Sequence, residues 1–177
     1  MPPEPTELER FEQSVLPHLP AAYNLARWLT RNEQDAQDVV QEASLRALRF
    51  FGGFHGGNSR PWLLTIVRNT CYTWLRQNRP AEPTAVFDEG LHSGNENPCT
   101  PETMLLRKYD NRSLKQALEE LPLEFREVLV LRELEGLSYK EIAEISGLQI
   151  GTVMSRLARA RKRLQESVVN RMNQEAT

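Results

Sequence analysis

A proline-rich acidic segment in the middle of the chain limits the folds open to this sequence more than any other feature. Residues 80–106 hold four prolines, two glycines and five acidic residues, without any Lys or Arg. A segment with low hydrophobicity and charge of one sign buries too little apolar surface to offset the conformational entropy that it would lose on folding. We therefore predict a flexible acidic linker here. The 177-residue chain is therefore expected to form two small domains, residues 1–79 and 107–177.

Both flanking segments have helical periodicity, and neither shows the alternation that is typical of strands. The predicted fold class is all-α: two small helical domains joined by the linker. Helices are expected at about Glu7–Leu16, Ala21–Thr30, Glu33–Phe51, Ser59–Arg79, Pro101–Glu120, Pro122–Glu135, Ser138–Ser146 and Ile150–Arg171. The glycine-rich stretch 51–59 is expected to be a loop. Ser59 would cap the helix that follows, with Pro61 in its first turn.

Two helices of the N-terminal segment have predicted core stripes. In the helix at 33–51 the stripe consists of Ala36, Val39, Val40, Ala43, Ala47 and Phe50. In the helix after Ser59 the stripe is unusually polar in its middle and consists of Trp62, Ile66, Asn69 or Thr70, Thr73 and Trp74.

Composition and charge exclude several classes of protein. The chain has 22 Lys and Arg against 24 Asp and Glu, and no run approaches the roughly 18 apolar residues of a membrane span. The acidic N-terminus does not fit a signal peptide. We therefore expect a cytoplasmic protein that does not insert into membranes.

The sequence predicts neither a metal site nor a cofactor. Two cysteines cannot build a disulfide framework or a zinc site; Cys71 is expected to be a buried filler, and Cys99 lies in the linker. A redox pair between these two cysteines is the less favoured alternative. His18, His55 and His92 are scattered without the spacing of metal ligands.

The C-terminal segment has the pattern of a helix-turn-helix. Ser138 and Glu141 fit a capping box, Ala143 is small enough for close helix contact, and Gly147 can supply a left-handed turn. The inward stripe of the last helix is predicted to be Ile150, Val153, Leu157, Ala160 and Leu164. Its outward face is predicted to hold Thr152, Ser155, Arg156, Arg159 and Arg163.

The same helix concentrates positive charge. Residues 151–163 contain five cations and no acidic residue, although the whole chain is nearly neutral. A basic face on an ordinary helix bundle is the simpler interpretation of the charge alone. Together with the cap, the turn glycine and the inward stripe, the charge favours a helix that enters the major groove of DNA.

Acidic side chains line the polar face of the helix at 33–51. Asp35, Asp38 and Glu42 are spaced at i, i+3 and i+7. Three carboxylates could form a metal or catalytic site, but no His, Lys or nucleophile is placed to complete one. Such residues are most often merely solvated. The remaining interpretation is a docking ridge, where complementary charge sets register and association rate.

Several motifs resemble those of bacterial sigma factors. The stretch containing DAQDVVQE and WLLTIVRNT resembles their second conserved region, over about residues 8–79. The stretch containing GTVMSRLARAR resembles their fourth region, over about residues 114–164. Two such regions joined by a linker are typical of the extracytoplasmic-function group, which consists of transcription initiation subunits rather than enzymes.

This resemblance implies a set of partners and site residues in the N-terminal segment. The DAQDVVQE helix would dock on the clamp of the largest catalytic subunit of core RNA polymerase through Asp35, Asp38, Gln41 and Glu42. The 54–59 loop and the next helix would read the minus-ten promoter element by capturing a flipped base. The residues implied in this contact are Asn58, Arg60, Arg68, Asn69, Arg76 and Arg79. Trp62 and Trp74 could stack on bases, although core packing is the favoured role for both.

In the C-terminal segment, the resemblance implies recognition of the minus-thirty-five element and contact with the flap of the second large subunit. The implied DNA-binding residues are Thr152, Ser155, Arg156, Arg159, Arg161 and Arg163. Met154 and Gln149 depart from residues common in the family, which leaves the promoter sequence open. The acidic linker would occupy the active-site cleft and RNA exit path until RNA displaces it.

The function expected from these features is promoter-specific initiation by core polymerase, in a stress or envelope response and under an anti-sigma factor. A stand-alone helix-turn-helix regulator is the alternative, and the DAQDVVQE ridge argues against it. An enzyme that uses the carboxylates is the least favoured hypothesis.

Overall fold

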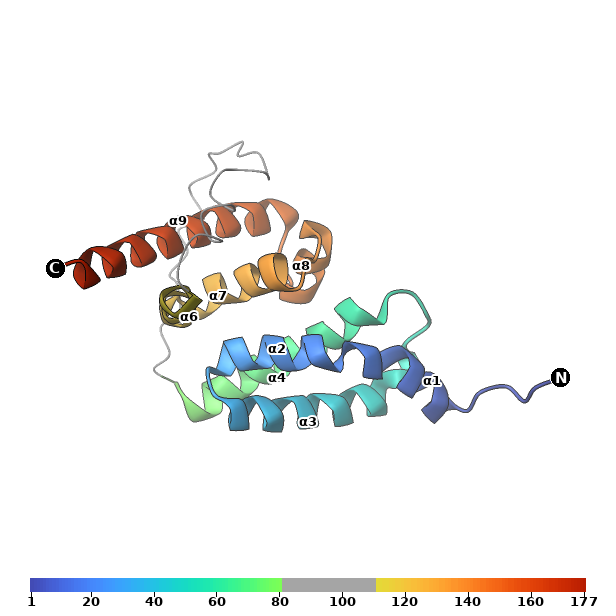
Figure 1. Ribbon diagram of the computed structural model, residues 1–177. Coiled ribbons are helices and arrows are strands. Elements are labelled where there is room, and N and C mark those ends of the chain that lie inside the picture. The colour runs from blue at the N-terminus through green and yellow to red at the C-terminus, as the bar shows by residue number, and fades with distance from the viewer. Residues whose placement is uncertain (81–110) are drawn as a thin grey trace. The chain divides into compact units, whose positions relative to one another are not determined.

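The computed structural model describes residues 1–80 and 111–177, and the regular secondary structure of these residues is all helical (Figure 1). The first region contains α1 (Glu7–Val15), α2 (Leu19–Thr30), α3 (Glu33–Phe50) and α4 (Ser59–Asn78). The second contains α6 (Asn111–Glu120), α7 (Leu123–Leu129), α8 (Tyr139–Ser146) and α9 (Ile150–Glu175). The all-α prediction is confirmed. The predicted linker lies outside the described residues apart from Pro80, as does the stretch 101–110 of the helix expected at Pro101–Glu120.

Local side-chain caps explain where α1 and α3 begin. Thr6 and Glu9 form a reciprocal capping box at the start of α1. The Asn32 side chain accepts a hydrogen bond from the Asp35 backbone N–H at 3.0 Å and starts α3. Between them, α2 ends where Arg31 adopts a left-handed conformation with φ of 60°. The break between α2 and α3 is therefore fixed by local chemistry.

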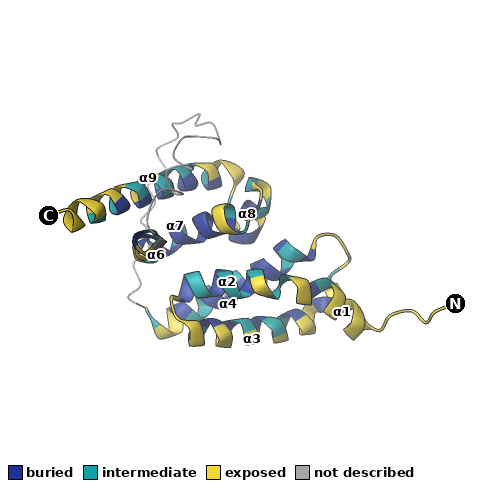
Figure 2. Ribbon diagram, in the orientation of Figure 1, coloured by how far each residue is buried: buried dark blue, intermediate teal, exposed yellow. Residues whose placement is uncertain are grey.

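The core of the first region lies between α2, α3 and α4, which pack against one another pairwise. The buried residues of α3 lie along one side of the helix and its exposed residues along the other (Figure 2). Ala36, Ala43 and Ala47 are fully buried there, so small side chains line the inner face of α3 and allow its neighbours to approach closely. Cys71 is also fully buried, which confirms its predicted role as a core filler.

Two predicted core stripes need correction. Val40 is only half-buried, and Phe50 is 60% exposed, because α3 ends there and a 3₁₀ turn at Phe51–Gly53 buries Phe51 instead. The buried stripe of α4 consists of Leu63, Leu64, Val67, Thr70, Cys71 and Leu75. Of the residues predicted for that stripe, Thr70 alone is buried. The leucine-rich face of α4 is more apolar than the tryptophan-bearing face, and it therefore packs into the core.

The second region is built around α9, against which α6 and α7 pack. Val153, Leu157, Ala160 and Leu164 are buried as predicted, whereas Ile150 is 46% exposed because it stands at the first position of α9. The helix expected at Pro122–Glu135 is α7 followed by a π-helical turn, Val130–Leu134. The last helix extends beyond its predicted end at Arg171 to Glu175.

A buried arginine joins α6 to α7. Arg126 is fully buried, and its Nη1 donates to the backbone carbonyls of Glu119 at 3.1 Å and Leu121 at 2.7 Å. These carbonyls lie at the C-terminal end of α6, where helical partners run out. Arg126 therefore closes α6 and places it against the rest of the second region.

Candidate functional site

The outer face of α3 carries the predicted acidic ridge, the set Asp35, Asp38, Gln41 and Glu42. Asp38, Gln41 and Glu42 are exposed, while Asp35 is half-buried. Glu42 forms an ion pair with Arg46 one turn later, at 2.5 Å. Such an exposed pair within a helix contributes little to stability, so these side chains can exchange partners easily.

Asp35 is held differently from the rest of the acidic ridge. Its Oδ2 accepts a hydrogen bond from Arg79 Nη2 at 2.8 Å, and the two side chains are 25% and 31% exposed. Arg79 Nη1 also donates to the Thr30 carbonyl. A residue expected to bind DNA thus contacts a residue expected to bind polymerase, and the pair fastens the end of α4 to the start of α3.

Two exposed leucines extend the acidic ridge. Leu45 is 64% exposed and Leu48 is 42% exposed. Leu45 follows Asp38 by seven residues and Gln41 by four, so it lies on the same face of α3. Neither leucine was predicted to belong to the site. The sequence could have indicated them, because both are apolar residues of α3 that lie outside its predicted core stripe.

The start of α4 corrects one predicted cap. Asn58, not Ser59, is the N-cap, and its Oδ1 accepts a hydrogen bond from the Arg60 N–H at 3.1 Å. Ser59 is buried in the first turn, and its hydroxyl donates to the Ser14 carbonyl of α1 at 2.6 Å. The helix of the predicted minus-ten contact is thereby anchored to α1.

Arg60 influences a histidine on a neighbouring turn. Burial of the imidazole, together with the nearby positive charge of Arg60, lowers the pKa of His18 below 6.5. His18 belongs to the 3₁₀ turn Leu16–His18, between α1 and α2. The neutral form of His18 is therefore favoured next to this predicted DNA contact.

The predicted minus-ten residues farther along α4 share its solvent face. Asn69 and Arg76 are exposed, and Arg68 is half-buried. Arg68 Nη1 donates to the Asn69 side-chain oxygen at 3.3 Å, and the guanidinium carbon lies 3.8 Å from the ring centroid of Tyr72. Tyr72 was not singled out from the sequence, although its position four residues from both Arg68 and Arg76 was the available signal.

An aromatic cluster supports the loop before α4. The ring of Phe51 contacts Phe11 at 5.4 Å and Phe54 at 5.9 Å, and Trp62 lies 5.0 Å from Phe54. Trp62 thus packs against other aromatic side chains, but it is only half-buried and does not belong to the buried stripe of α4. Trp74 is half-buried and lies beneath the Arg79 guanidinium at 5.3 Å.

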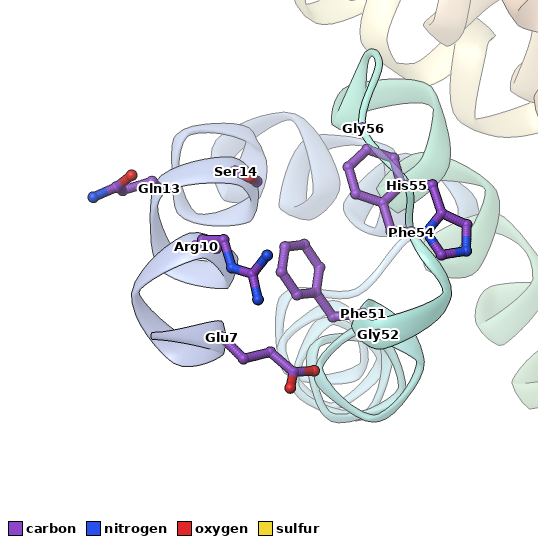
Figure 3. A pocket seen from close by; sticks show the side chains of 9 residues that line it. All are labelled: Glu7, Arg10, Gln13, Ser14, Phe51, Gly52, Phe54, His55 and Gly56. Atoms are coloured by element: carbon purple, nitrogen blue, oxygen red, sulfur yellow. The ribbon is translucent and has the colours of Figure 1, made fainter. Parts of the chain in front are cut away.

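A hollow of about 430 Å³ opens beside this cluster, between α1 and the 51–56 segment. Glu7 and Arg10 of α1 face Phe51 and Gly52 across it, and His55 lies near its rim (Figure 3). A side-chain atom placed on Gly52 would lie 3.4 Å from Glu7 Oε1, which is a contact that the flexible end of the Glu7 side chain can accommodate.

The turn between α8 and α9 follows the helix-turn-helix prediction. Gly147 has φ of 68°, and the Leu148 N–H donates to the Ala143 carbonyl at 3.0 Å. Gln149 stands at the N-cap of α9 without a side-chain hydrogen bond to the helix. Thr152, Ser155 and Arg159 are half-buried on the first turns of α9.

The cations of α9 lie in different environments. Arg156 is only 8% exposed, which corrects its expected place on the outer face. Arg161 donates from Nε at 3.0 Å and from Nη2 at 2.7 Å to one oxygen of Glu133, in the π-helical turn. Arg163 is exposed, with its guanidinium 5.9 Å from the centroid of the Phe125 ring. Burial of Arg156 and the ion pair of Arg161 therefore set these two residues apart from the exposed Arg163.

Residues 1–80 and 111–177 contain no group of three His, Cys, Asp or Glu side chains suited to a metal ion. None of the helices in these two ranges is both long and apolar enough to cross a membrane. Cys99 lies outside the described residues, so its pairing with Cys71 is not tested.

Described residues that form two helical regions, the second with a helix-turn-helix, have the organisation of a DNA-binding protein. Residues 15–80 match the model of Sigma-70 region 2, and residues 111–164 match that of Sigma-70, region 4. The chain is 35% identical to the RNA polymerase sigma-H factor of Pseudomonas aeruginosa over 166 residues, covering 89% of this chain and 86% of that protein. It is 36% identical to the ECF RNA polymerase sigma-E factor of Haemophilus influenzae over 153 residues, covering 81% and 79%. The chain belongs to the ECF RNA polymerase sigma factors, a non-enzymatic family of transcription initiation.

Two solved structures resemble the fold. One is the sigma factor RpoE in complex with the anti-sigma factor NepR from Bartonella quintana, with TM-score 0.68, 31% identity and coverage of 90% of this chain and 96% of that chain. The other is CnrH in complex with the cytosolic domain of CnrY, with TM-score 0.62, 28% identity and coverage of 88% and 85%.

Proposed function

We propose that this sigma factor directs core RNA polymerase to its promoters through three surfaces. The acidic ridge of α3 docks on the clamp of the largest catalytic subunit. The solvent face of α4 and the loop before it bind the minus-ten element, and the first turns of α9 bind the minus-thirty-five element, next to a contact with the flap. In this proposal residues 1–79 and 107–177 are the two working domains and 80–106 is the linker. The protein acts in the cytoplasm, where polymerase and promoters are.

The observation that carries this proposal is that the first region exposes an acidic face on α3 and a basic face on α4. Asp38, Gln41 and Glu42 are exposed on α3, whereas Asn69 and Arg76 are exposed on α4. An acidic face would repel DNA and a basic face would attract it. A region that carries both is suited to holding a basic protein surface and a nucleic acid at the same time.

The local environments rank the residues proposed for DNA contact. In the first region these are Asn58, Arg60, Arg68, Asn69, Arg76 and Arg79, and in the second Thr152, Ser155, Arg156, Arg159, Arg161 and Arg163. Asn69 and Arg76, which are exposed, are best suited to base or phosphate contact on α4. On α9, the family resemblance assigns base reading to Ser155 and Arg159. The ion pairs of Arg79 and Arg161, and the burial of Arg156, suit these three to positioning the surfaces instead.

An anti-sigma factor is the proposed regulator. The RpoE relative was solved with its anti-sigma factor NepR. The similarity extends over 90% of this chain and includes both helical regions, which supports an inhibitor of the same kind here. A stress or envelope signal would release the sigma factor from it.

Run-off transcription with core polymerase and a promoter library tests the proposal. Promoter-dependent transcripts are expected from the reconstituted enzyme, and Asp38→Ala should weaken core binding by about 1 kcal/mol or more. Glu12→Ala, which removes an exposed acid from α1, is the matched control and should bind core as the wild type does. Absence of both transcripts and core binding would overturn the proposal. Tight sequence-specific binding to duplex DNA without core would favour a stand-alone regulator.

A further inference from the structure

Tyr72 occupies the centre of the solvent face of α4. It lies four residues after Arg68 and four before Arg76, so the three side chains follow one another along one side of the helix. Leu64, Cys71 and Leu75 are buried on other sides of α4. Tyr72 is only half-buried, which leaves a portion of a large aromatic ring at the surface proposed to bind the minus-ten element.

The ring of Tyr72 already holds a planar cation. The Arg68 guanidinium carbon lies 3.8 Å from the ring centroid, so the group covers a face of the ring and not its edge. A cation–π contact at an exposed site contributes only about 0.5–1 kcal/mol. The cation–π contact on this ring face is therefore weak enough for another flat group to replace it.

The surroundings of the ring match the chemistry of an unpaired nucleotide. Single-stranded nucleic acid is bound by aromatic rings that stack on bases, with cations nearby that hold the phosphates. Arg68 and Arg76 stand about one helical turn before and after Tyr72, about 6 Å in each direction along the axis. Asn69, which is exposed beside them, offers both a hydrogen-bond donor and an acceptor to a base edge.

The tryptophans of the same helix are less suited to this role. Trp62 packs against Phe54 at 5.0 Å and against Phe51 at 6.2 Å. Trp74 lies next to the Arg79 guanidinium, whose ion pair with Asp35 fixes the end of α4. Tyr72 is instead placed between two arginines that the proposed function assigns to the single strand.

We propose that Tyr72 is a stacking platform for one unpaired base of the promoter strand that the sigma factor holds open. The base takes the place of the Arg68 guanidinium on the ring, and Arg68 turns to the adjoining phosphate, with Arg76 on the other side. This inference rests on the proposed minus-ten contact. Tyr72 would contribute aromatic stacking to a surface whose other proposed contacts are ionic or hydrogen-bonded.

The test uses the full chain bound to core polymerase. The probe is a fluorescent single-stranded oligonucleotide that carries the non-template strand of a promoter identified by transcript mapping. Tyr72→Phe keeps the ring and should bind within twofold of the wild type. Tyr72→Ala and Tyr72→Leu lose the ring and should bind on the order of tenfold more weakly. Tyr23→Ala removes a half-buried tyrosine from α2 and is the matched control, expected to leave oligonucleotide binding unchanged.

A scan of abasic positions identifies the stacked base. Removing that base should weaken binding to the wild type and to Tyr72→Phe on the order of tenfold. It should have almost no effect on Tyr72→Ala, because the stacking partner is already gone. Circular dichroism and core binding check that each variant is folded.

The outcomes separate this inference from the function on which it rests. If the wild-type holoenzyme does not prefer the non-template strand over the template strand, the minus-ten proposal fails as a whole. If the wild type shows that preference but Tyr72→Ala binds as Tyr72→Phe does, the stacking role of Tyr72 is wrong. Identical abasic profiles for the wild type and Tyr72→Ala would overturn it equally.

Discussion

Two arginines of α9, Arg159 and Arg161, are close in sequence but differ in their surroundings. Arg159 stands on the half-exposed face with Ser155, whereas Arg161 makes two hydrogen bonds to Glu133. The Arg161 side chain is 13% exposed and that of Glu133 is 29% exposed, so solvent screens this pair less than it screens a fully exposed one. Arg161 is therefore expected to hold the π-helical turn against α9.

We predict that Arg161→Ala lowers the free energy of unfolding by about 1 kcal/mol because the ion pair is lost. Arg159→Ala should lower by about one the slope of log affinity against log salt concentration for holoenzyme binding to the minus-thirty-five element, because one phosphate or base contact is lost. Urea unfolding and binding across a salt series measure the two effects. Lys162→Ala, an exposed neighbour, is the stability control. A loss of salt dependence in Arg161→Ala without a loss of stability would restore Arg161 to the DNA-binding set.

His18 gives the first region a predictable response to pH. Burial, which is the larger cause, and the positive charge of Arg60 both lower the pKa of this imidazole below 6.5. As pH falls below about 6.5, the unfolded chain takes up a proton before the folded chain does, so stability decreases as the pH drops toward the folded pKa. An NMR titration of the imidazole should show a higher pKa in Arg60→Gln that still lies below 6.5, because burial remains. An unchanged pKa in this variant would exclude Arg60 as a cause.

At the scale of elements, the turn between α8 and α9 depends on one backbone angle. Gly147 has φ of 68°, and a side-chain atom added there would meet nothing within 4 Å. The cost of Gly147→Ala is therefore a backbone cost, about 1–2 kcal/mol. Gly147→Asn should recover some of it, because asparagine tolerates this conformation better.

Gly151 provides the matched control for this turn. It lies in the first turn of α9, and its added side-chain atom would also meet nothing within 4 Å. Gly151→Ala should be neutral or stabilising by up to about 1 kcal/mol, because alanine favours helix more than glycine does. Thermal unfolding followed by circular dichroism compares the three variants. Equal losses for Gly147→Ala and Gly151→Ala would contradict the role of the left-handed turn.

Sequence periodicity was a good guide wherever one face of a helix is clearly more apolar than the others. The inward residues of α9 from Val153 to Leu164 and the buried alanines of α3 were predicted on this basis. The predicted core stripe of α4 is wrong because the helix has two adjacent apolar faces. The prediction chose the face with the tryptophans, whereas the face with the leucines is buried. The spacing of apolar residues within one helix distinguishes poorly between two such faces. The face that is buried depends on how α4 packs against α2 and α3.

The candidate site was predicted in outline, but its internal contacts were not. The acidic ridge and the basic face of α9 follow from helical spacing, so their residues could be named from sequence. The Arg79–Asp35 pair joins residues 44 positions apart, and Arg161–Glu133 joins residues 28 positions apart. Contacts at such separations depend on how helices pack, and spacing within a helix carries no information about them.

At the scale of the whole molecule, the distribution of charge limits what the free protein can bind. Residues 107–177 include 13 basic and 11 acidic side chains, and residues 1–79 include 9 and 8. The five acids of 80–106 outweigh both surpluses and leave the chain at a net charge of −2. A protein with this balance should bind DNA weakly alone, since non-specific affinity depends on neutralised phosphates. In the proposed function, promoter binding therefore requires polymerase to bring both proposed DNA-binding surfaces to the same duplex.

We predict that a variant with amides in place of these five acids binds DNA without polymerase. The substitutions are Glu82→Gln, Asp88→Asn, Glu89→Gln, Glu96→Gln and Glu102→Gln. The free variant should bind random duplex on the order of tenfold more tightly at low ionic strength, because its linker no longer repels the phosphates. The gain should shrink as added salt screens the charges. Fluorescence anisotropy across a salt series measures both effects.

The matched control exchanges the same residues between Glu and Asp, which changes every side chain but keeps all five charges. This control should bind random duplex as the wild type does. If the amide variant also binds as the wild type does, the linker charge has no role in keeping the free protein from DNA. If both variants bind more tightly, the effect comes from side-chain identity and not from charge. Tighter binding confined to the amide variant would show that the acidic charge of residues 80–106 weakens DNA binding by the free protein.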